Sequence, residues 1–199
     1  FGQVTKTSPM GTIEDPFNPG ELAIGAVVTF FARSFDMTVK YLDEVMLAAA
    51  KHKGTALVEV LQNCVIFNNG AHHYYTDKQN REDRIIHLED GKPMIFGKDK
   101  NKGIRLCNDK NHLEVITIGE NGYTIDDVLV HDSHQVDRGV QMMLAQMKGP
   151  DYPVAVGVIR DISKPCYSEL MDEQIAKAKE TSKFKCVDDL LHSGNTWTV

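Results

Sequence analysis

The hydrophobic pattern of residues 19–62 alternates between helical and strand-like spacing. Asn18 is a residue type that caps helices well, and Pro19 suits the first helical position, so a short helix is expected to begin there. The compact β-prone run 29–33 predicts a strand directly after this helix. A first helix and a first strand are therefore expected within this part of the chain.

A second helix and a second strand are predicted next. Asp36 or Thr38 could cap the helix, whose apolar positions recur at helical spacing. These positions are Val39, Leu42, Val45, Met46 and Ala49. Residues 56–61 predict a mostly covered strand, because apolar residues fill it except at Glu59. The order helix, strand, helix, strand predicts a parallel strand pair joined by a right-handed crossover.

The pattern changes after residue 70, where charged and turn-forming residues separate short apolar runs. These runs predict strands at 84–88, 93–96, 103–107, 113–118 and 154–159, and a further short one at 128–131. Helices are predicted at 136–147 and 167–180 and near 187–191. We therefore divide the chain into an α/β segment, 1–70, and a β-rich segment with a C-terminal helical extension, 71–199, which is expected to form a subunit interface.

Composition and charge exclude several classes of partner. The chain has 199 residues, a formal net charge of −6 and a pI near 5.7, so nothing favours binding to nucleic acid or to an anionic membrane. No apolar run approaches the roughly 20 residues that span a bilayer, and no secretory signal is visible. The four cysteines are widely scattered, which favours reduced thiols and a cytoplasmic location.

Cys64 is the first candidate for chemistry. It follows the predicted strand 56–61, and the turn-forming residues 68–70 come shortly after it. The carboxyl ends of strands in open α/β sheets are where ligands bind. The local pattern favours a buried, inert cysteine, since free cysteine packs as a small hydrophobic residue. A cluster ligand or a nucleophile remains an alternative, although no base for a nucleophile is evident.

Two histidine-containing stretches are competing candidates. His72 and His73, followed by Asp77, offer metal ligands, but a solvated loop is the favoured interpretation. The stretch His-Asp-Ser-His at 131–134 resembles a metal-binding or triad fragment. Here we favour capping of the next helix by Asp132 or Ser133.

No familiar catalytic motif accompanies these candidates. Met142, Met143 and Met147 are interpreted as core residues. The sequence contains no P-loop, no GxGxxG fingerprint, no GxSxG elbow and no HExxH motif. The pattern alone therefore indicates an α/β protein with a candidate thiol at a sheet edge, and it does not identify a function.

Three long stretches, residues 5–19, 25–33 and 52–68, carry a resemblance to a known family. In this order and spacing they closely resemble the β subunit of 2-oxoacid:ferredoxin oxidoreductases, in particular the 2-oxoglutarate type. Residues 185–191 and 194–197 resemble the end of that subunit in its longer bacterial forms. The resemblance implies the C-terminal part of a thiamine diphosphate-binding, pyruvate:ferredoxin oxidoreductase-like parallel-sheet domain. The resemblance also implies that a small β-rich excursion and terminal helices follow this domain.

The resemblance also implies an activity. Members of the family oxidatively decarboxylate a 2-oxoacid on thiamine diphosphate and magnesium, form an acyl-CoA, and pass electrons through a 4Fe-4S cluster to ferredoxin. Their partners are an α subunit, ferredoxin, coenzyme A and the 2-oxoacid. By this resemblance Cys64 matches the last cluster-ligating cysteine, in the setting Gln-x-Cys-x-x-Phe-Asn. Lys6, Thr7 and Ser8 are expected near the cofactor region, but none is assigned as a ligand or as a catalytic residue.

The departures from the family pattern are equally informative. The other three cluster cysteines and the Gly-Asp-Gly and Asn-Asn elements that hold the diphosphate are absent, and Cys107, Cys166 and Cys186 match no cluster position. The chain also begins at Phe1 rather than at methionine. We therefore expect a C-terminal portion of a β subunit that is inactive alone and retains no cofactor. The alternatives are a non-catalytic interface or binding module with an inert, buried Cys64 and, less favoured, a mononuclear metal hydrolase.

Overall fold

The computed structural model describes residues 1–107, 109, 111–195 and 197, and it divides into two compact units. The first unit comprises Phe1–Ser163 and the second Lys164–Val199. Residue 196 of the stretch 194–197 lies outside the described residues.

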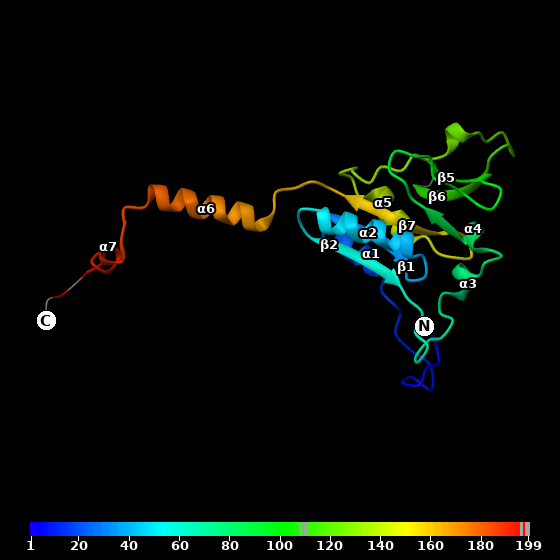
Figure 1. The fold of residues 1–199 in the computed structure, drawn as a ribbon, viewed down its shortest axis with the longest axis horizontal. Coiled ribbons are helices and arrows are strands. Elements are labelled where there is room, and N and C mark those ends of the chain that lie inside the picture. The colour runs from blue at the N-terminus through cyan, green and yellow to red at the C-terminus, as the bar shows by residue number, and fades with distance from the viewer. Residues whose placement is uncertain (108, 110, 196, 198–199) are drawn as a thin grey trace. The chain divides into compact units, whose positions relative to one another are not determined.

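The first unit contains the two predicted helix–strand pairs. They are α1 (Pro19–Gly25), β1 (Phe30–Phe35), α2 (Val39–Lys51) and β2 (Ala56–Leu61) (Figure 1). The Asn18 side chain caps α1, because its Oδ1 accepts hydrogen bonds from the backbone N–H groups of Gly20 and Glu21. Thr38 occupies the N-cap position of α2 without a side-chain cap. The predicted helix-strand-helix-strand order is confirmed.

Most elements after residue 70 are short. They are α3 (His73–Thr76), α4 (Arg81–Arg84), β3 (Ile85–His87), β4 (Ile95–Phe96), β5 (Lys102–Cys107), β6 (His112–Thr117), the 3-10 turn η1 (Ile125–Asp127), α5 (Gly139–Gln146) and β7 (Val154–Asp161). The short predicted strands are thus present except at 128–131. There the described backbone forms only an isolated bridge, between Pro93 and Val130.

A four-stranded sheet has the order β2-β1-β7-β3. β1 pairs in parallel with β2, as predicted, and β3 pairs in parallel with β7. The β1–β7 pairing is antiparallel, so the sheet is mixed. The sheet draws strands from both predicted segments, 1–70 and 71–199. A smaller antiparallel sheet has the order β4-β5-β6.

Helices pack on both faces of β1. Phe30 and Ala32 pack with Val45 of α2, whereas Phe31 belongs to a cluster with Ile24 of α1 and Leu144 of α5. Figure 1 shows α2 along the β1–β2 pair. The same large cluster includes buried residues of the small sheet, so this core joins the small sheet to the helices on one face of β1.

β2 differs from the sequence prediction, because it is an edge strand of the described sheet rather than a covered one. Leu57 is 36% exposed and Val60 is 39% exposed. The apolar composition of β2 therefore does not reflect burial within this chain.

The helix predicted at 136–147 is also shorter than expected, because α5 begins at Gly139 and Val136 is exposed. The capping role expected for Asp132 or Ser133 is wrong. Asp132 instead accepts a 2.9 Å hydrogen bond from the backbone of His134, and the Ser133 hydroxyl donates to Asp90. The methionine prediction is confirmed, since Met147 is buried and the other two methionines pack against the core.

The second unit contains α6 (Tyr167–Thr181) and α7 (Val187–Leu191). Both helices lie close to their predicted ranges. The structure describes every residue of these two helices, and none of them is buried.

Candidate functional site

The carboxyl ends of β1 and β2 lie side by side, because Phe35 and Leu61 are register partners in the parallel pair. The backbone N–H of Asp36 donates to the carbonyl of Leu61 at 3.3 Å. The Asp36 carboxylate in turn accepts a 3.4 Å hydrogen bond from the backbone N–H of Asn63. These contacts place the loop after β2 at the carboxyl ends of the strands, which is where α/β proteins bind ligands.

Asn63 holds that loop together. Its side-chain Nδ2 donates to Asn69 at 3.1 Å, and its Oδ1 accepts from the backbone N–H of Gly70 at 2.8 Å. Gly70 has a φ of 83°, a conformation that glycine adopts without steric cost. The backbone N–H of Asn68 donates to the carbonyl of Cys64 at 2.9 Å, which closes the turn.

Cys64 presents an exposed thiol on this loop, three residues after β2 ends. Backbone N–H groups, that of Phe67 first and then those of Ile66 and Asn68, lower the pKa of this thiol, because hydrogen bonds to sulfur stabilise the thiolate. The interpretation of Cys64 as a buried cysteine is therefore wrong. The thiolate is the form that ligates metals.

A cavity of about 320 Å³ lies beside the loop. Its lining residues come from the ends of β1 and β2 and from α3: Asp36, Met37, Asn63, Asn69, Gly70, His72, His73 and Thr76. Sequence reasoning considered Asp36 only as a helix cap. The sequence signal that could have placed Asp36 at this cavity is its position directly after a strand that was predicted to pair in parallel.

His72 and His73 lie at the start of α3, next to this cavity. The His72 ring packs edge-on against Phe35, with ring centroids 6.0 Å apart. Asp77 ends α3, and its pKa is lowered, first by the backbone N–H of Gln79. Within the described ranges, none of these three residues joins a group of three metal ligands, so the structure offers no support for a metal site here.

The histidines of the 131–134 stretch have separate roles. His131 is buried, its Nε2 lies 2.8 Å from the carbonyl of Val158, and burial lowers its pKa. His134 is exposed, and its Nδ1 lies 2.6 Å from the carbonyl of Asp161, a contact that raises its pKa. In the part of the chain that the structure describes, neither belongs to a group of three metal ligands. Among the described residues, the histidines named for the hydrolase alternative are therefore not part of a three-ligand group.

The N-terminal loop carries Lys6, Thr7 and Ser8 in a turn. The backbone N–H of Ser8 donates to the carbonyl of Thr5 at 3.2 Å, and the hydroxyls of Thr5 and Thr7 are 3.2 Å apart. The described contacts of this turn are local, so its expected approach to a cofactor stays a prediction.

A 4Fe-4S cluster needs four cysteine ligands. In this chain one cysteine, Cys64, has the properties of such a ligand. Cys64 is an accessible thiol with a lowered pKa, which suits a cluster ligand. In the described ranges Cys64 belongs to no group of three potential metal ligands. Cys166 and Cys186 belong to the second unit.

Comparison with known proteins finds a solved structure with a similar fold. A solved structure of 2-oxoglutarate:ferredoxin oxidoreductase from Magnetococcus marinus, with 2-oxoglutarate, coenzyme A and succinyl-CoA bound, matches with a TM-score of 0.61 and 18% identity. The match covers 98% of this chain and 50% of that chain. This likeness agrees with the α/β fold described above. No family model matches the sequence.

The sequence relatives are more specific. Subunit KorB of 2-oxoglutarate oxidoreductase from Mycobacterium tuberculosis is 36% identical over 100% of this chain and 52% of its own length. The β subunit of 2-oxoacid:ferredoxin oxidoreductase 1 from Aeropyrum pernix is 39% identical over 45% of this chain and 26% of its own length. The chain is similar along its whole length to subunit KorB, and over part of its length to a β subunit of 2-oxoacid:ferredoxin oxidoreductase, and it spans about half the length of the more extensive of these two matches. No described helix is long and apolar enough to cross a membrane.

Proposed function

We propose that this chain forms the C-terminal part of the β subunit of a 2-oxoacid:ferredoxin oxidoreductase that acts on 2-oxoglutarate. The complete enzyme would oxidatively decarboxylate the 2-oxoacid to an acyl-CoA and transfer electrons through an iron–sulfur cluster to ferredoxin, in the cytoplasm. The observation that carries this proposal is the 36% identity with the Mycobacterium tuberculosis subunit along the entire chain. The agreement in fold with a structure of the same enzyme class supports it.

In this proposal Cys64 supplies one thiolate ligand to a 4Fe-4S cluster. Its loop is fixed by Asn63, and backbone N–H groups of Ile66 and Phe67 donate to its sulfur. Such hydrogen bonds stabilise the thiolate and raise the reduction potential of a cluster. When bound, thiamine diphosphate and magnesium supply the carbanion chemistry of decarboxylation. Residues outside this chain would hold them, so these 199 residues alone are expected to have no activity and to retain no cofactor.

The proposed partners are the α subunit, ferredoxin, coenzyme A and the 2-oxoacid. A non-catalytic interface role is a second candidate for the C-terminal unit. It is supported by the exposed apolar side chains of Val187, Leu190, Leu191 and Trp197. Surfaces of this kind are typical of protein–protein contacts. The two roles are compatible, because one concerns the first unit and the other the second.

The test uses the full-length subunit purified anaerobically with its α subunit. We expect reduction of a viologen dye that requires both 2-oxoglutarate and coenzyme A. The variant Cys64→Ser should lose the cluster iron and sulfide together with this activity. Cys166→Ser, a thiol in the second unit, is the matched control and should keep both. A Cys64→Ser preparation that keeps the full iron and sulfide content would show that Cys64 is not a cluster ligand. A complex that oxidises other 2-oxoacids but not 2-oxoglutarate would overturn the substrate assignment.

A further inference from the structure

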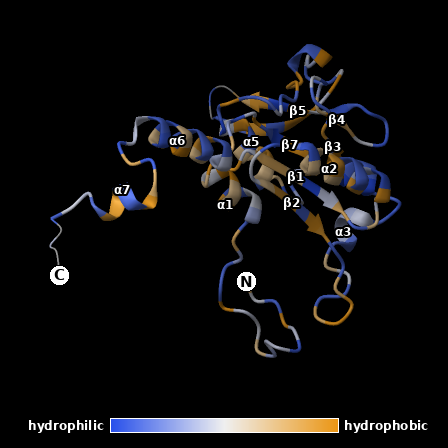
Figure 2. Cartoon of the chain, turned by 60° about the vertical axis from the view of Figure 1, so that its left-hand side comes forward, coloured by the Kyte–Doolittle hydropathy of each residue, from blue (hydrophilic) through white to orange (hydrophobic). Residues whose placement is uncertain are grey.

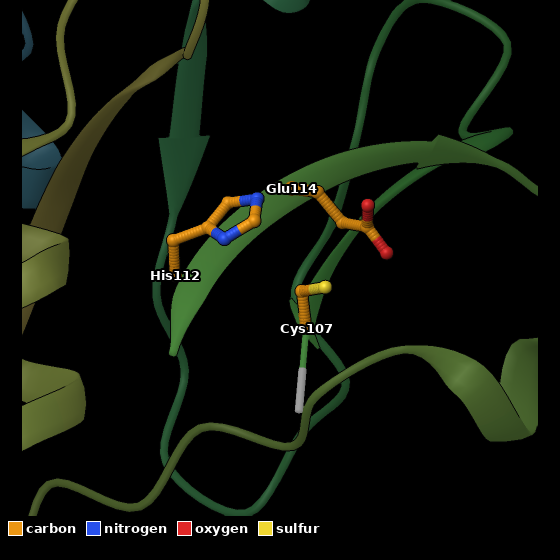
Figure 3. Close-up of side chains that lie close together, drawn as sticks. All are labelled: Cys107, His112 and Glu114. Carbon is orange, nitrogen blue, oxygen red and sulfur yellow. The ribbon is translucent and has the colours of Figure 1, made fainter. Parts of the chain in front are cut away.

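The β5–β6 hairpin places three potential metal ligands on one face. Cys107 is the register partner of His112, and Arg105 is the register partner of Glu114. Residues two apart on a strand share a face, and directly opposed residues have Cβ atoms about 4.5–5.5 Å apart. Cys107, His112 and Glu114 therefore point to the same side of the hairpin, as Figure 3 shows.

The ligand atoms of this trio are already close together. One atom each from Cys107, His112 and Glu114 lie within 4.8 Å of one another, and among the described residues this is the group of three that meets such a limit. In a tetrahedral zinc site with bonds of about 2.0–2.3 Å, ligand atoms are about 3.3–3.8 Å apart. Small rotations of the three side chains are sufficient to close this difference, and the paired backbones need not move.

The donor chemistry of the trio suits zinc. A thiolate, an imidazole and a carboxylate are the three ligand types that Zn²⁺ takes in proteins. A Cys107 thiolate and the Glu114 carboxylate together balance the charge of a divalent ion. All three residues are partly exposed, so an ion can enter and water can occupy a fourth position. Binding would release the thiol proton.

Arg105 completes the arrangement as an outer partner. Its Nη1 donates to Oε1 of Glu114, which leaves Oε2 available as a ligand atom. Carboxylates that bind metals are commonly oriented by a further hydrogen bond of this kind. The guanidinium also lies 5.5 Å from the ring centroid of Tyr123, which helps to fix its position.

We propose that Cys107, His112 and Glu114 form a binding site for a divalent transition-metal ion, with Zn²⁺ as the best-fitting ion and water as its fourth ligand. The site is separate from the Cys64 loop and does not depend on the proposed function. The alternative is that Glu114 serves only as the cross-strand ion-pair partner of Arg105, with Cys107 and His112 near it by coincidence. The experiment below separates these two cases.

The experiment titrates the reduced, metal-free chain with Co²⁺, a spectroscopic substitute for Zn²⁺, under anaerobic conditions. Serine replaces Cys64, Cys166 and Cys186 so that Cys107 is the remaining thiol. We expect one equivalent of Co²⁺ to bind, with a thiolate-to-cobalt charge-transfer band and the visible bands of a tetrahedral site. Addition of Zn²⁺ should abolish both signals by displacement.

Single variants then identify the ligands. Cys107→Ser in this background should abolish the charge-transfer band, and His112→Gln should weaken Co²⁺ binding by about 10- to 100-fold or more, since even loss of an outer partner has an effect of this size. Glu114→Gln keeps an acceptor for Arg105 and should weaken binding about tenfold. Glu120→Gln, which replaces an exposed acidic residue shortly after β6, is the control. Circular dichroism of each variant establishes folding. Absence of the charge-transfer band in the parent, or variants that match the control, would overturn the site.

Discussion

Glu59 is the polar residue that interrupts the apolar run of β2, and Arg33 on the neighbouring strand explains it. The Arg33 Nε donates to Oε2 of Glu59 at 2.6 Å, and the two residues are register partners in the parallel pair. Arg33 is only 4% exposed and also donates to the carbonyl of Ala145 at 3.0 Å. The pair therefore neutralises a cation that the fold has buried.

Replacement of Glu59 by alanine should destabilise the first unit by about 3 kcal/mol, because it leaves the Arg33 guanidinium buried without its counter-ion. Urea denaturation monitored by circular dichroism measures this change. The control is Glu44→Ala, which removes an exposed pair with Lys40 at 4.0 Å and should cost less than about 0.5 kcal/mol. Equal effects of the two substitutions would contradict the prediction.

The Cys64 thiol should ionise at a lower pH than a free cysteine, because backbone N–H groups of its loop stabilise the thiolate. The rate of iodoacetamide alkylation of Cys64, followed by mass spectrometry across pH, should therefore rise with a midpoint below the ordinary value of about 8.5. A synthetic peptide of residues 60–70 provides the comparison, since its loop is not held by Asp36. Identical midpoints in the peptide and the protein would show that the loop does not tune the thiol.

At the scale of elements, β2 and the loop that follows it form an apolar edge. Leu57 and Val60 of the strand are partly exposed, and Val65, Ile66 and Phe67 of the loop are 52–73% exposed. Figure 2 shows hydrophobic colouring in this loop. The strand also has hydrogen-bonding groups with no neighbouring strand in the described sheet. Such edges favour association with another chain segment.

Phe67→Asp should therefore reduce self-association of the isolated chain, because it places a charge in the exposed apolar loop of this edge. Analytical ultracentrifugation across protein concentration measures the change. Val136→Asp is the matched control, since Val136 is 74% exposed in a different loop. The prediction fails if both substitutions change association equally or if the parent chain is monomeric at all concentrations.

The sequence predicted local elements well where short-range chemistry determines them. Asn18 and Pro19 marked the start of α1, and alternating patterns located the parallel pair. Prediction from the sequence failed where contacts with distant segments of the chain determine the structure. The exposure of β2 depends on its place at the sheet edge, and Asp132 and Ser133 are engaged by His134 and Asp90 rather than by α5.

The candidate sites divide in the same way. The position of Cys64 followed from the chain pattern and the family resemblance, whereas the cavity beside it depends on how the ends of β1 and β2 meet α3. The trio on the β5–β6 hairpin was missed, because strand register rather than sequence proximity brings Cys107 close to Glu114.

At the scale of the whole molecule, the first unit should fold without the second. The helices α6 and α7, which the structure describes completely, bury none of their residues. A chain that ends at Ser163 should therefore lose less than about 1 kcal/mol of stability, which corresponds to a shift of about 2–4 °C in Tm. Differential scanning calorimetry of the truncated and full chains measures this. Loss of a cooperative transition on truncation would show that the second unit is part of the fold.

The central position of β7 has a consequence for how the chain folds during synthesis. β7 lies between β1 and β3, although it comes last in sequence among the described strands. The ribosome must therefore deliver residue 161 before β1 can gain its second neighbour. Until then β2 is the neighbour that the described strands offer to β1, and a two-stranded sheet is marginally stable on its own. Non-local pairing of this kind slows folding and leaves the nascent chain dependent on protection from aggregation.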